Sequence, residues 1–233
     1  MRARVTPLGD AALLVAFDPV IDLRLNAQVH TLASHLAARG LSGVRDIVPA
    51  YASCAVHFDP LRTDRDALRQ AVDDVLARLD PAPAGPDAAS TVDIPVCYGG
   101  AFGPDLPFVS AHAGCSEQDL VGLHAGREYR VFMIGFLPGF PYMGTLDERI
   151  ALPRRDAPRP RVPAGSVGVA GRQTGIYPVD APGGWHIIGR TPMRLFDPLS
   201  SPPARLAPGD AVRFVAIDEA AYQRSADLPV RNG

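Results

Sequence analysis

The stretch PRRDAPRPRVPAGSVGVAGRQTGIYPVDAPGGWHIIGRTPM, residues 153–193, decides the fold predicted for the second half of the chain. Its apolar residues alternate in short runs, such as Val167/Val169 and Trp185/Ile187, and this alternation predicts β-strands. Proline and glycine separate the runs at every step, so turns follow one another closely. Many short, interrupted strands are typical of a closed or nearly closed β-barrel with helices at its ends.

Positive charge is concentrated in the same stretch. It contains six arginines and two aspartates, a net charge of +4 in a chain whose formal net charge is −2. Guanidinium groups and backbone amides on strand ends and loops suit the recognition of carboxylates or phosphates. We therefore expect an anion site here; the alternative interpretation is a solvated, arginine-rich loop.

The N-terminal half has a different pattern. Strand patterns around Val5 and over residues 12–17 precede a helical pattern, two further strand patterns and a second helical pattern, which opens with a capping-box pair, Thr63 and Asp66. The order strand, helix, two strands, helix, strand is that of the ferredoxin-like fold. The run Val92–Tyr98 either closes this first sheet or begins the second domain.

The domain boundary is expected where periodicity is lost. Residues 80–90, DPAPAGPDAAS, are rich in proline, alanine and glycine, as linkers are. We therefore predict an α+β ferredoxin-like domain over residues 1–85 and a mainly-β barrel domain over residues 86–233.

Composition excludes several kinds of chemistry. The chain has no lysine, so all 23 basic residues are arginine. This excludes a P-loop lysine, a Schiff base, a biotin attachment site and a serine–lysine amidase centre. The three cysteines have no CxxC spacing and the aspartates no metal-ligand spacing, so we expect neither a disulfide framework nor a metal site.

Charge and hydropathy indicate the compartment and the partners. The net charge is close to zero, which gives no general attraction to nucleic acid or to membranes. The N-terminal apolar run AALLVAF is only seven residues long and is bracketed by Asp10 and Asp18. It fits neither a signal peptide nor a membrane span, so we expect a cytoplasmic protein.

Candidate site residues also lie outside the arginine-rich stretch. His124 is near the end of a predicted helix, where it is either an acid or base at a ligand site or a partner of the last helix carbonyls. The segment IGFLPGFPYMG, residues 134–144, lines a pocket, docks a protein or forms a buried connection. In GGAFGPDL, residues 99–106, backbone amides could hold an anion, or Asp105 caps the following helix.

Five motifs, in this order, resemble the KipI family. They are GGAFGPDL, YRVFMIGFLPGFPYMG, LPRRDAPRPRVPAGSVGVAGRQTGIYP, PGGWHIIGRTP and LAPGDAVRF, and the match runs from about Val92 to Ile217. The family is also labelled allophanate hydrolase subunit 1, or the B subunit of 5-oxoprolinase. The resemblance implies an N-terminal α+β domain and a C-terminal cyclophilin-like barrel, in agreement with the pattern of the residues.

The resemblance also implies a role within a complex. With a KipA-like C subunit and an A subunit, such a chain takes part in the ATP-dependent cleavage of 5-oxoproline (pyroglutamate) to glutamate, and we expect it to be inactive alone. ATP would bind to this chain or to one of its partners. Two alternatives remain: a KipI-like regulator that inhibits a sensor histidine kinase, and a component of a urea or amide carboxylation system.

On the enzyme hypothesis, residues of the barrel bind a small carboxylate or lactam. Arg159 and Arg190 would hold a carboxylate or phosphate, with Arg155 in the same cationic lip, and His124 is the tentative acid or base. Tyr177 and Trp185 would wall the pocket, while Gln173 and Thr174 would supply polar contacts. The expected partner-binding residues are Phe136, Pro138, Phe140 and Tyr142.

Overall fold

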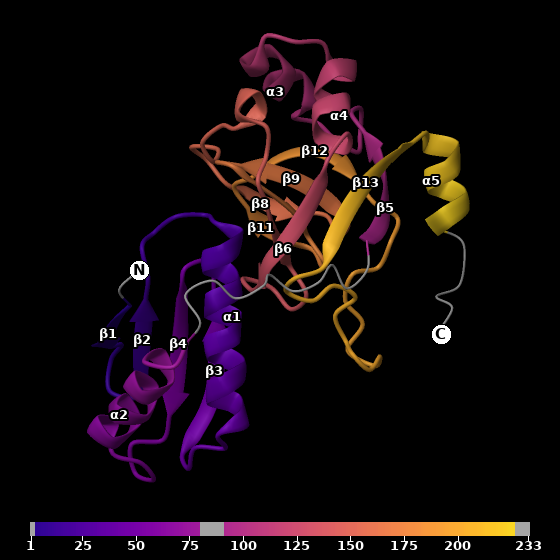
Figure 1. Ribbon diagram of the computed structural model, residues 1–233. Coiled ribbons are helices and arrows are strands. Elements are labelled where there is room, and N and C mark those ends of the chain that lie inside the picture. Colours follow the sequence, from indigo (N-terminus) through magenta and orange to yellow (C-terminus); the bar gives the residue numbers. More distant parts are fainter. Residues whose placement is uncertain (1–2, 80–90, 227–233) are drawn as a thin grey trace. The chain divides into compact units, whose positions relative to one another are not determined.

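The computed structural model describes residues 3–79 and 91–226, and the chain divides into two compact units, residues 1–87 and 88–233 (Figure 1). The predicted boundary between residues 85 and 86 and the predicted linker over residues 80–90 lie outside the described residues.

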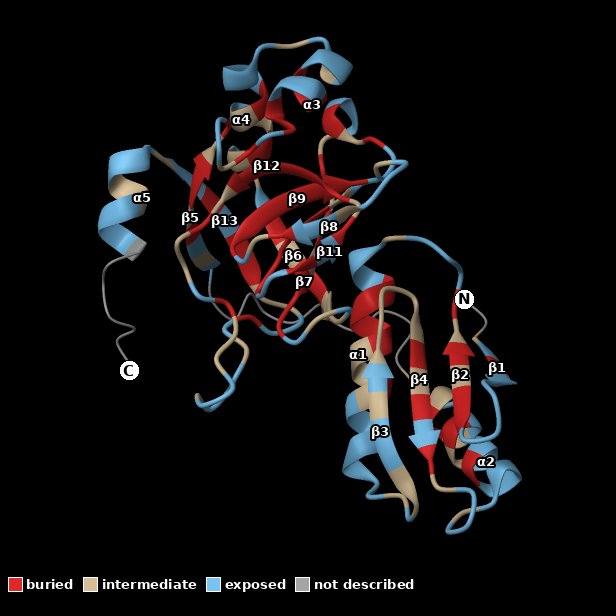
Figure 2. Ribbon diagram, turned by 180° about the vertical axis from the view of Figure 1, so that it is seen from behind, coloured by how far each residue is buried: buried red, intermediate tan, exposed pale blue. Residues whose placement is uncertain are grey.

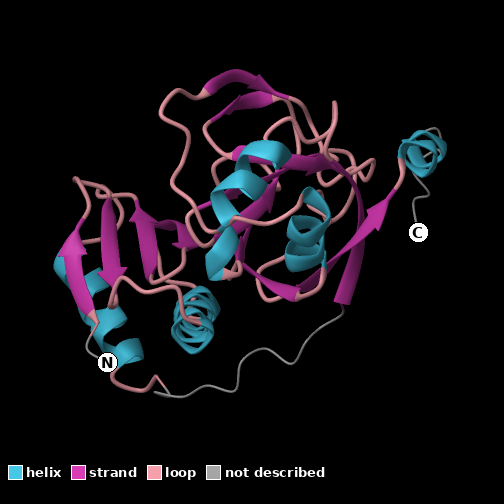
Figure 3. Cartoon of the chain, turned by 90° about the horizontal axis from the view of Figure 1, so that it is seen from above, coloured by secondary structure: helices cyan, strands magenta, loops and turns pink. Residues whose placement is uncertain are grey.

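The N-terminal unit is an antiparallel sheet with two helices on one face (Figure 3). Its strand order is β1-β2-β4-β3. The elements are β1 (Arg4–Pro7), β2 (Ala12–Ala16), α1 (Leu23–Ala38), β3 (Val44–Pro49), β4 (Ser53–Phe58) and α2 (Arg65–Leu76). Both helices bury an apolar face against alternate residues of the strands, which gives the unit its own core.

The predicted ferredoxin-like order differs from this unit in one strand. The prediction completes the sheet with a strand after the second helix. In the structure β1 pairs with β2 at that edge, and the strand after α2, β5 (Thr91–Tyr98), belongs to the barrel. The sequence did not show to which domain the strand Val92–Tyr98 belongs, because an apolar run does not identify the strand that it pairs with.

Side-chain caps fix where the first two helices begin. The carboxylate of Asp22 accepts a hydrogen bond from the Leu25 amide at 2.8 Å and starts α1. The capping-box pair predicted for α2 was wrong by one residue. Asp64 is the N-cap, and its carboxylate accepts from the amides of Asp66 and Ala67. An aspartate beside a threonine is the better acceptor at this position.

The second unit contains the closed barrel that the sequence predicts. Seven strands follow one another in the order β10-β7-β6-β13-β5-β12-β9, and β9 pairs with β10 to close the ring. Neighbours are antiparallel except β5 and β13, which are parallel. The remaining strands are β6 (Glu128–Ile134), β7 (Pro141–Gly144), β9 (Ser166–Ala170), β10 (Gln173–Ile176), β12 (His186–Arg190) and β13 (Ala211–Ile217).

Short elements cover the outside of the barrel. α3 (Leu106–Ala113) and α4 (Glu117–Ala125) lie together at one end (Figures 1 and 3). The Ser116–Asp119 capping box starts α4. A single 3-10 turn, η1 (Glu148–Ile150), precedes a two-stranded sheet of β8 (Arg159–Val162) and β11 (Ala181–Gly183). The C-terminal α5 (Glu219–Ala226) packs beside β5.

The barrel wall is buried on both sides where β9 and β12 pass (Figure 2). One apolar cluster fills the inside and takes members from all seven strands, for example Val169 and Ile188. A second cluster lies on the outer side and contains Trp185, Ile187 and Tyr177. Because successive strand residues point to opposite sides, the alternation seen in the sequence supplies both clusters. The outer cluster carries the candidate site.

The loop before α3 is pressed against the barrel, which gives a test of the packing. A Cβ atom at Gly103 would lie 2.0 Å from the carbonyl oxygen of Ile188, whereas one at Gly122, on the exposed face of α4, would meet nothing within 4 Å. We expect Gly103→Ala to lower the free energy of unfolding by about 1–3 kcal/mol. Gly122→Ala should raise it by about 0.5–1 kcal/mol, as alanine favours helix. Urea denaturation measures both, and equal effects would contradict this packing.

Candidate functional site

A buried carboxylate organises the arginine-rich segment. Asp105 is 5% exposed, and its oxygens accept hydrogen bonds from Arg159 at 2.7 and 2.8 Å and from Arg155 at 3.1 Å. The same carboxylate accepts from the Ile187 amide at 2.6 Å. Asp105 is the N-cap residue of α3, as predicted, but its carboxylate makes no hydrogen bond to that helix, because charged partners far along the chain compete more strongly for it.

The pKa of Asp105 shows which effect dominates. Burial alone would raise this pKa, but the hydrogen bonds from Arg159 and Ile187 and the charges of both arginines outweigh burial and lower it. The carboxylate is therefore ionised at neutral pH. Arg155 and Arg159, predicted to bind substrate, are thus engaged by an internal anion.

The other arginines of residues 153–193 differ in their partners. Arg161 pairs with Asp180 and Arg172 with Glu148. Arg190 lies 6.0 Å above the Phe102 ring, and its Nε is buried without a hydrogen-bond partner in the described chain. Arg154 is exposed and has no ion pair with any described residue. Arg154 and Arg190 are therefore the arginines of this stretch without an ion pair among the described residues, and of the two Arg154 is the one that lines the cavities described below.

Arg154 lines a cleft on the outer side of the barrel, which we call the aromatic cleft. Its volume is about 210 Å³, below the range of pockets for drug-sized ligands, so it suits a small molecule. The cleft is lined by Phe136, Phe140, Tyr142, Arg154, Pro158, Tyr177, Pro182, Gly183, Gly184 and Trp185. The structure thus brings together the predicted pocket wall, Tyr177 and Trp185, with the predicted partner-binding aromatics.

Edge-to-face contacts hold the aromatic rings in place. Phe140 is 1% exposed, and its ring centroid lies 5.2 Å from that of Tyr177 and 5.5 Å from that of Trp185. A ring enclosed in this way has almost no surface to offer a docking protein, so its predicted partner-binding role does not fit the structure. Phe136 is different: it is 61% exposed and adopts a left-handed φ of 66°.

The two tyrosines of the cleft are hydrogen-bond donors at neutral pH. Burial raises the pKa of both Tyr142 and Tyr177. The charge of Arg154 opposes this in Tyr142, while in Tyr177 a hydrogen bond with the Trp185 backbone and, to a lesser extent, the charge of Arg154 oppose it. The cleft therefore combines neutral hydroxyl donors, one cation and apolar ring surfaces. This combination can hold a carboxylate at Arg154 and a neutral planar group between the rings.

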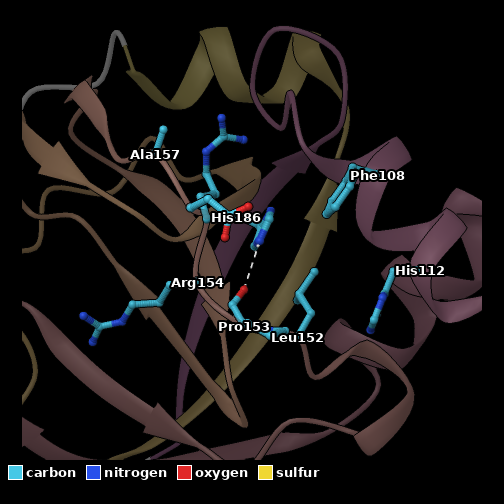
Figure 4. Close-up of a pocket in the computed structure, with 9 residues that line it drawn as sticks. Phe108, His112, Leu152, Pro153, Arg154, Ala157 and His186 are labelled. Atoms are coloured by element: carbon cyan, nitrogen blue, oxygen red, sulfur yellow. Dashed lines mark hydrogen bonds between the residues drawn. The ribbon is translucent and has the colours of Figure 1, made fainter.

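Figure 4 shows a second cavity, which we call the His186 pocket. Arg154 lines both this pocket and the aromatic cleft. Its volume is about 380 Å³. The Nε2 of His186 donates to the carbonyl oxygen of Pro153 at 3.1 Å, and the ring stacks on Phe108 with centroids 5.2 Å apart. The pocket is lined by Phe108, His112, Leu152, Pro153, Arg154, Arg155, Asp156, Ala157 and His186.

His124 lies elsewhere, inside the barrel, with 0% exposure. Thr174 Oγ1 donates to the Gly168 carbonyl, so it accepts from His124 Nε2 at 2.9 Å. The Nδ1 atom then accepts from the Tyr98 hydroxyl at 2.8 Å. The imidazole is therefore neutral, and burial, with the charge of Arg127, lowers its pKa to about 3.

This geometry corrects both interpretations of His124. The ring bonds to Tyr98 and Thr174 rather than to helix carbonyls, and it has no surface from which to act as an acid or base. Thr174 shares this interior position, which removes it from the predicted polar contacts. Gln173 and Arg190 line neither the aromatic cleft nor the His186 pocket.

The sequence analysis counted Arg154 among the six arginines of residues 153–193 without selecting it. Arg154 could have been selected by elimination, because Asp105, Asp180 and Glu148 form ion pairs with other arginines of the stretch. Those pairings are non-local, so the sequence does not reveal them. Phe108 was missed because an apolar residue in a helix predicts core, although Phe108 is 60% exposed.

The described residues contain no group of three or more His, Cys, Asp or Glu side chains placed to hold a metal ion. None of the helices in residues 3–79 and 91–226 is long and apolar enough to cross a lipid bilayer.

Comparison with known proteins identifies the family. A family model described as "Carboxyltransferase domain, subdomain C and D" matches residues 3–206. The B subunit of 5-oxoprolinase from Bacillus subtilis (strain 168) is 39% identical over 95% of this chain and 96% of its own length. The protein of that name from Escherichia coli O157:H7 is 41% identical, over 94% and 98%. The crystal structure of TTHA0988 is 37% identical, with a TM-score of 0.77 over 89% of this chain and 40% of that chain.

The family model and the barrel define the class: the chain belongs to the carboxyltransferase subdomain C and D family. Within it, the chain groups with proteins named as B subunits of 5-oxoprolinase, as its KipI-like motifs predicted. The urea amidolyase of K. lactis, 17% identical with a TM-score of 0.79 over 95% of this chain and 15% of that chain, shares the fold alone.

Removing His124 should change how stability depends on pH. Its pKa is about 3 in the folded chain and ordinarily 6.5, so its neutral form stabilises the fold above pH 6.5, and this contribution falls as the pH drops toward 3. The free energy of unfolding of the native chain minus that of His124→Gln should therefore shrink below pH 6.5, by up to about 1.4 kcal/mol per pH unit. His35→Gln, on the exposed face of α1, is the control. A difference that stays constant from pH 7 to 4 would contradict this assignment.

Breaking the Asp105 contacts should destabilise the barrel unit strongly. Asp105→Asn leaves Arg155 and Arg159 without their anion, and we expect the free energy of unfolding at pH 7 to fall by about 3 kcal/mol or more. Because the pKa of Asp105 is lowered, the native contribution is present at neutral pH and is lost in acid. Asp93→Asn, which breaks an exposed pair with Arg213, is the matched control and should change little. Equal urea midpoints for the two variants would refute the role given to Asp105.

Proposed function

We propose that this chain is the B subunit of an ATP-dependent 5-oxoprolinase, inactive without a KipA-like C subunit and an A subunit. The observation that carries the proposal is a cleft suited to a small planar carboxylate in a chain whose relatives, 35–41% identical over most of its length, are named as B subunits of 5-oxoprolinase.

The substrate fits the chemistry of the aromatic cleft. 5-Oxoproline has a carboxylate, which Arg154 would hold, and a planar five-membered lactam, which the faces and edges of Trp185 and Tyr177 would flank. Binding would thus orient the amide toward groups supplied by the partner proteins.

ATP enters the proposal as a second substrate. Transfer of the γ-phosphoryl group of ATP to the lactam oxygen, with release of ADP, would activate the ring carbon toward water. Addition of water and cleavage of the C–N bond would open the ring to an acyl phosphate of glutamate, and a second water would release phosphate and glutamate. In this chain, Arg154 would offset negative charge at the cleft. The remaining groups for phosphoryl transfer would come from the other subunits.

One observation favours a second candidate function, regulation of a sensor histidine kinase. Phe136 is 61% exposed at the mouth of the cleft, in a loop that also contains the exposed Pro138. An exposed aromatic side chain is a common anchor for protein contacts. Pro138→Asp, in the same exposed loop but outside the cleft lining, should abolish kinase inhibition and spare oxoprolinase turnover if that role holds. Urea carboxylation has less support, because the sequence match to a putative urea carboxylase covers only 38% of this chain and the likeness to urea amidolyase is of fold alone.

The enzyme proposal is tested in the assembled complex. The chain is co-purified with its C-type partner, the A subunit is added, and ADP release that depends on 5-oxoproline is measured. Arg154→Gln removes the charge at the cleft, and we expect kcat/KM for 5-oxoproline to fall about 10- to 100-fold, mainly through a higher KM. Arg161→Gln, whose charge is paired with Asp180 outside the cleft, should change kcat/KM less than twofold.

Two results would count against the proposal. Full activity of Arg154→Gln would remove the anion site, and full activity of the A and C subunits without this chain would remove its role in the complex.

A further inference from the structure

The loop at the mouth of the aromatic cleft holds Phe136 in an unfavourable backbone conformation. Within residues 3–79 and 91–226, Phe136 is the one non-glycine residue with a positive φ, 66°. A bulky side chain in the left-handed region costs free energy that glycine would avoid. The Leu137 amide donates to the Gly135 carbonyl at 2.7 Å, which closes a tight three-residue turn around Phe136. Backbone strain of this kind gathers at functional sites, so the side chain at this position is a candidate for a function.

Hydrogen bonds and close packing fix the turn in place. The Gly135 amide donates to the Phe140 carbonyl at 3.2 Å, and the Phe140 amide donates to the Leu137 carbonyl at 3.0 Å. A Cβ atom at Gly139 would lie 3.0 Å from the Cβ atom of Phe196, so the loop also packs closely against the segment that follows β12. The aromatic ring at the centre of the turn is therefore presented from a backbone with little freedom to move.

The Phe136 ring stands at right angles to two walls of the aromatic cleft. Its plane lies at 87° to that of Phe140 and at 88° to that of Tyr177, with centroids 5.6 and 6.4 Å away. The planes of Phe140 and Tyr177 are 86° apart, so the three rings are mutually perpendicular. Phe140 and Tyr177 are each 1% exposed and form buried walls, whereas Phe136 is 61% exposed and lies at the opening. A ligand in the cleft therefore meets apolar ring surface in more than one direction.

We propose that Phe136 is the specificity-determining residue of the aromatic cleft: its ring covers the bound lactam and limits the ligand to a single small ring. The inference rests on the proposed function, because it starts from a lactam bound between Trp185 and Tyr177. A bound ring buries part of the exposed Phe136 surface, which strengthens binding. A larger ring has to displace Phe136, and the fixed turn resists this displacement.

Calorimetric titration of the chain, with its C-type partner present, measures the selectivity. The two ligands are 5-oxoproline and 6-oxopiperidine-2-carboxylate, its homologue with one more methylene group in the ring. We expect the native chain to bind 5-oxoproline more tightly than the homologue by about tenfold or more. Phe136→Ala opens the cleft, so the affinity for 5-oxoproline should fall about fivefold and the preference should fall below about threefold. Phe136→Tyr keeps an aromatic ring at this position and should retain the native preference.

The matched control is Phe108→Ala. Phe108 is 60% exposed, almost as much as Phe136, but it does not line the aromatic cleft, so its loss should leave the preference unchanged.

The backbone strain is tested separately from ligand binding. Phe136→Gly should melt about 2–4 °C above Phe136→Ala, because glycine adopts a positive φ without the penalty of a Cβ atom.

Three results would overturn the inference: the same preference in Phe136→Ala as in the native chain, a preference lost in Phe136→Tyr as it is in Phe136→Ala, or a glycine variant no more stable than the alanine variant. Titration of Arg154→Gln separates this inference from the proposed function. If 5-oxoproline binds in an Arg154-dependent way and Phe136→Ala keeps the native preference, only this inference fails. If 5-oxoproline does not bind to the native chain with its partner, the proposed function fails and this inference fails with it.

Discussion

The barrel unit depends on how one buried charge, the carboxylate of Asp105, is compensated. Placing a carboxylate out of water is costly unless charged donors and backbone amides surround it. Arg155 and Arg159 and the Ile187 amide meet that requirement, and the Arg155 amide also donates to the Gly184 carbonyl. Together these bonds join the start of α3, the strand β12 and the segment that enters β8. These contacts also fix the position of the Arg154 backbone, because Arg154 precedes the anchored Arg155 in the chain.

The positive charge of residues 153–193 therefore has two uses. Most of it is balanced within the unit by Asp105, Asp180 and Glu148, where it joins segments that are far apart in the chain. Arg154, which has no anion among the described residues, lies where the aromatic cleft and the His186 pocket meet. A total charge count does not separate these uses. The two uses are distinguished by the partner of each guanidinium group, and an arginine without an internal anion can bind a ligand.

Local patterns predicted local structure well. Alternation in residues 167–169 and 185–187 predicted barrel strands, and the strand pattern over residues 12–17 predicted β2. Tyr177 and Trp185 do line one cleft, although their ligand stays a prediction.

Errors in the predictions arose where a residue had both a near and a distant partner. The Asp105 carboxylate bonds to arginines about 50 positions away and not to the amides of its own helix. The His124 ring bonds to Tyr98 and Thr174 and not to the last carbonyl groups of α4. The strand beside β2 at the sheet edge was also open: β1 occupies this place, and sequence periodicity does not show which strand pairs there.

The parallel pairing of β5 with β13 has a consequence for how the protein is made. The Asp93–Arg213 contact across this pair joins residues 120 positions apart, and β13 also completes the wall beside β6. During synthesis the ring stays open until β13 has left the ribosome, because no earlier strand occupies that place. The N-terminal sheet and its two helices have their own core and can fold first. Until β13 is available, the strands of the barrel expose an unpaired edge and apolar surface, so this unit is the one that needs protection from aggregation.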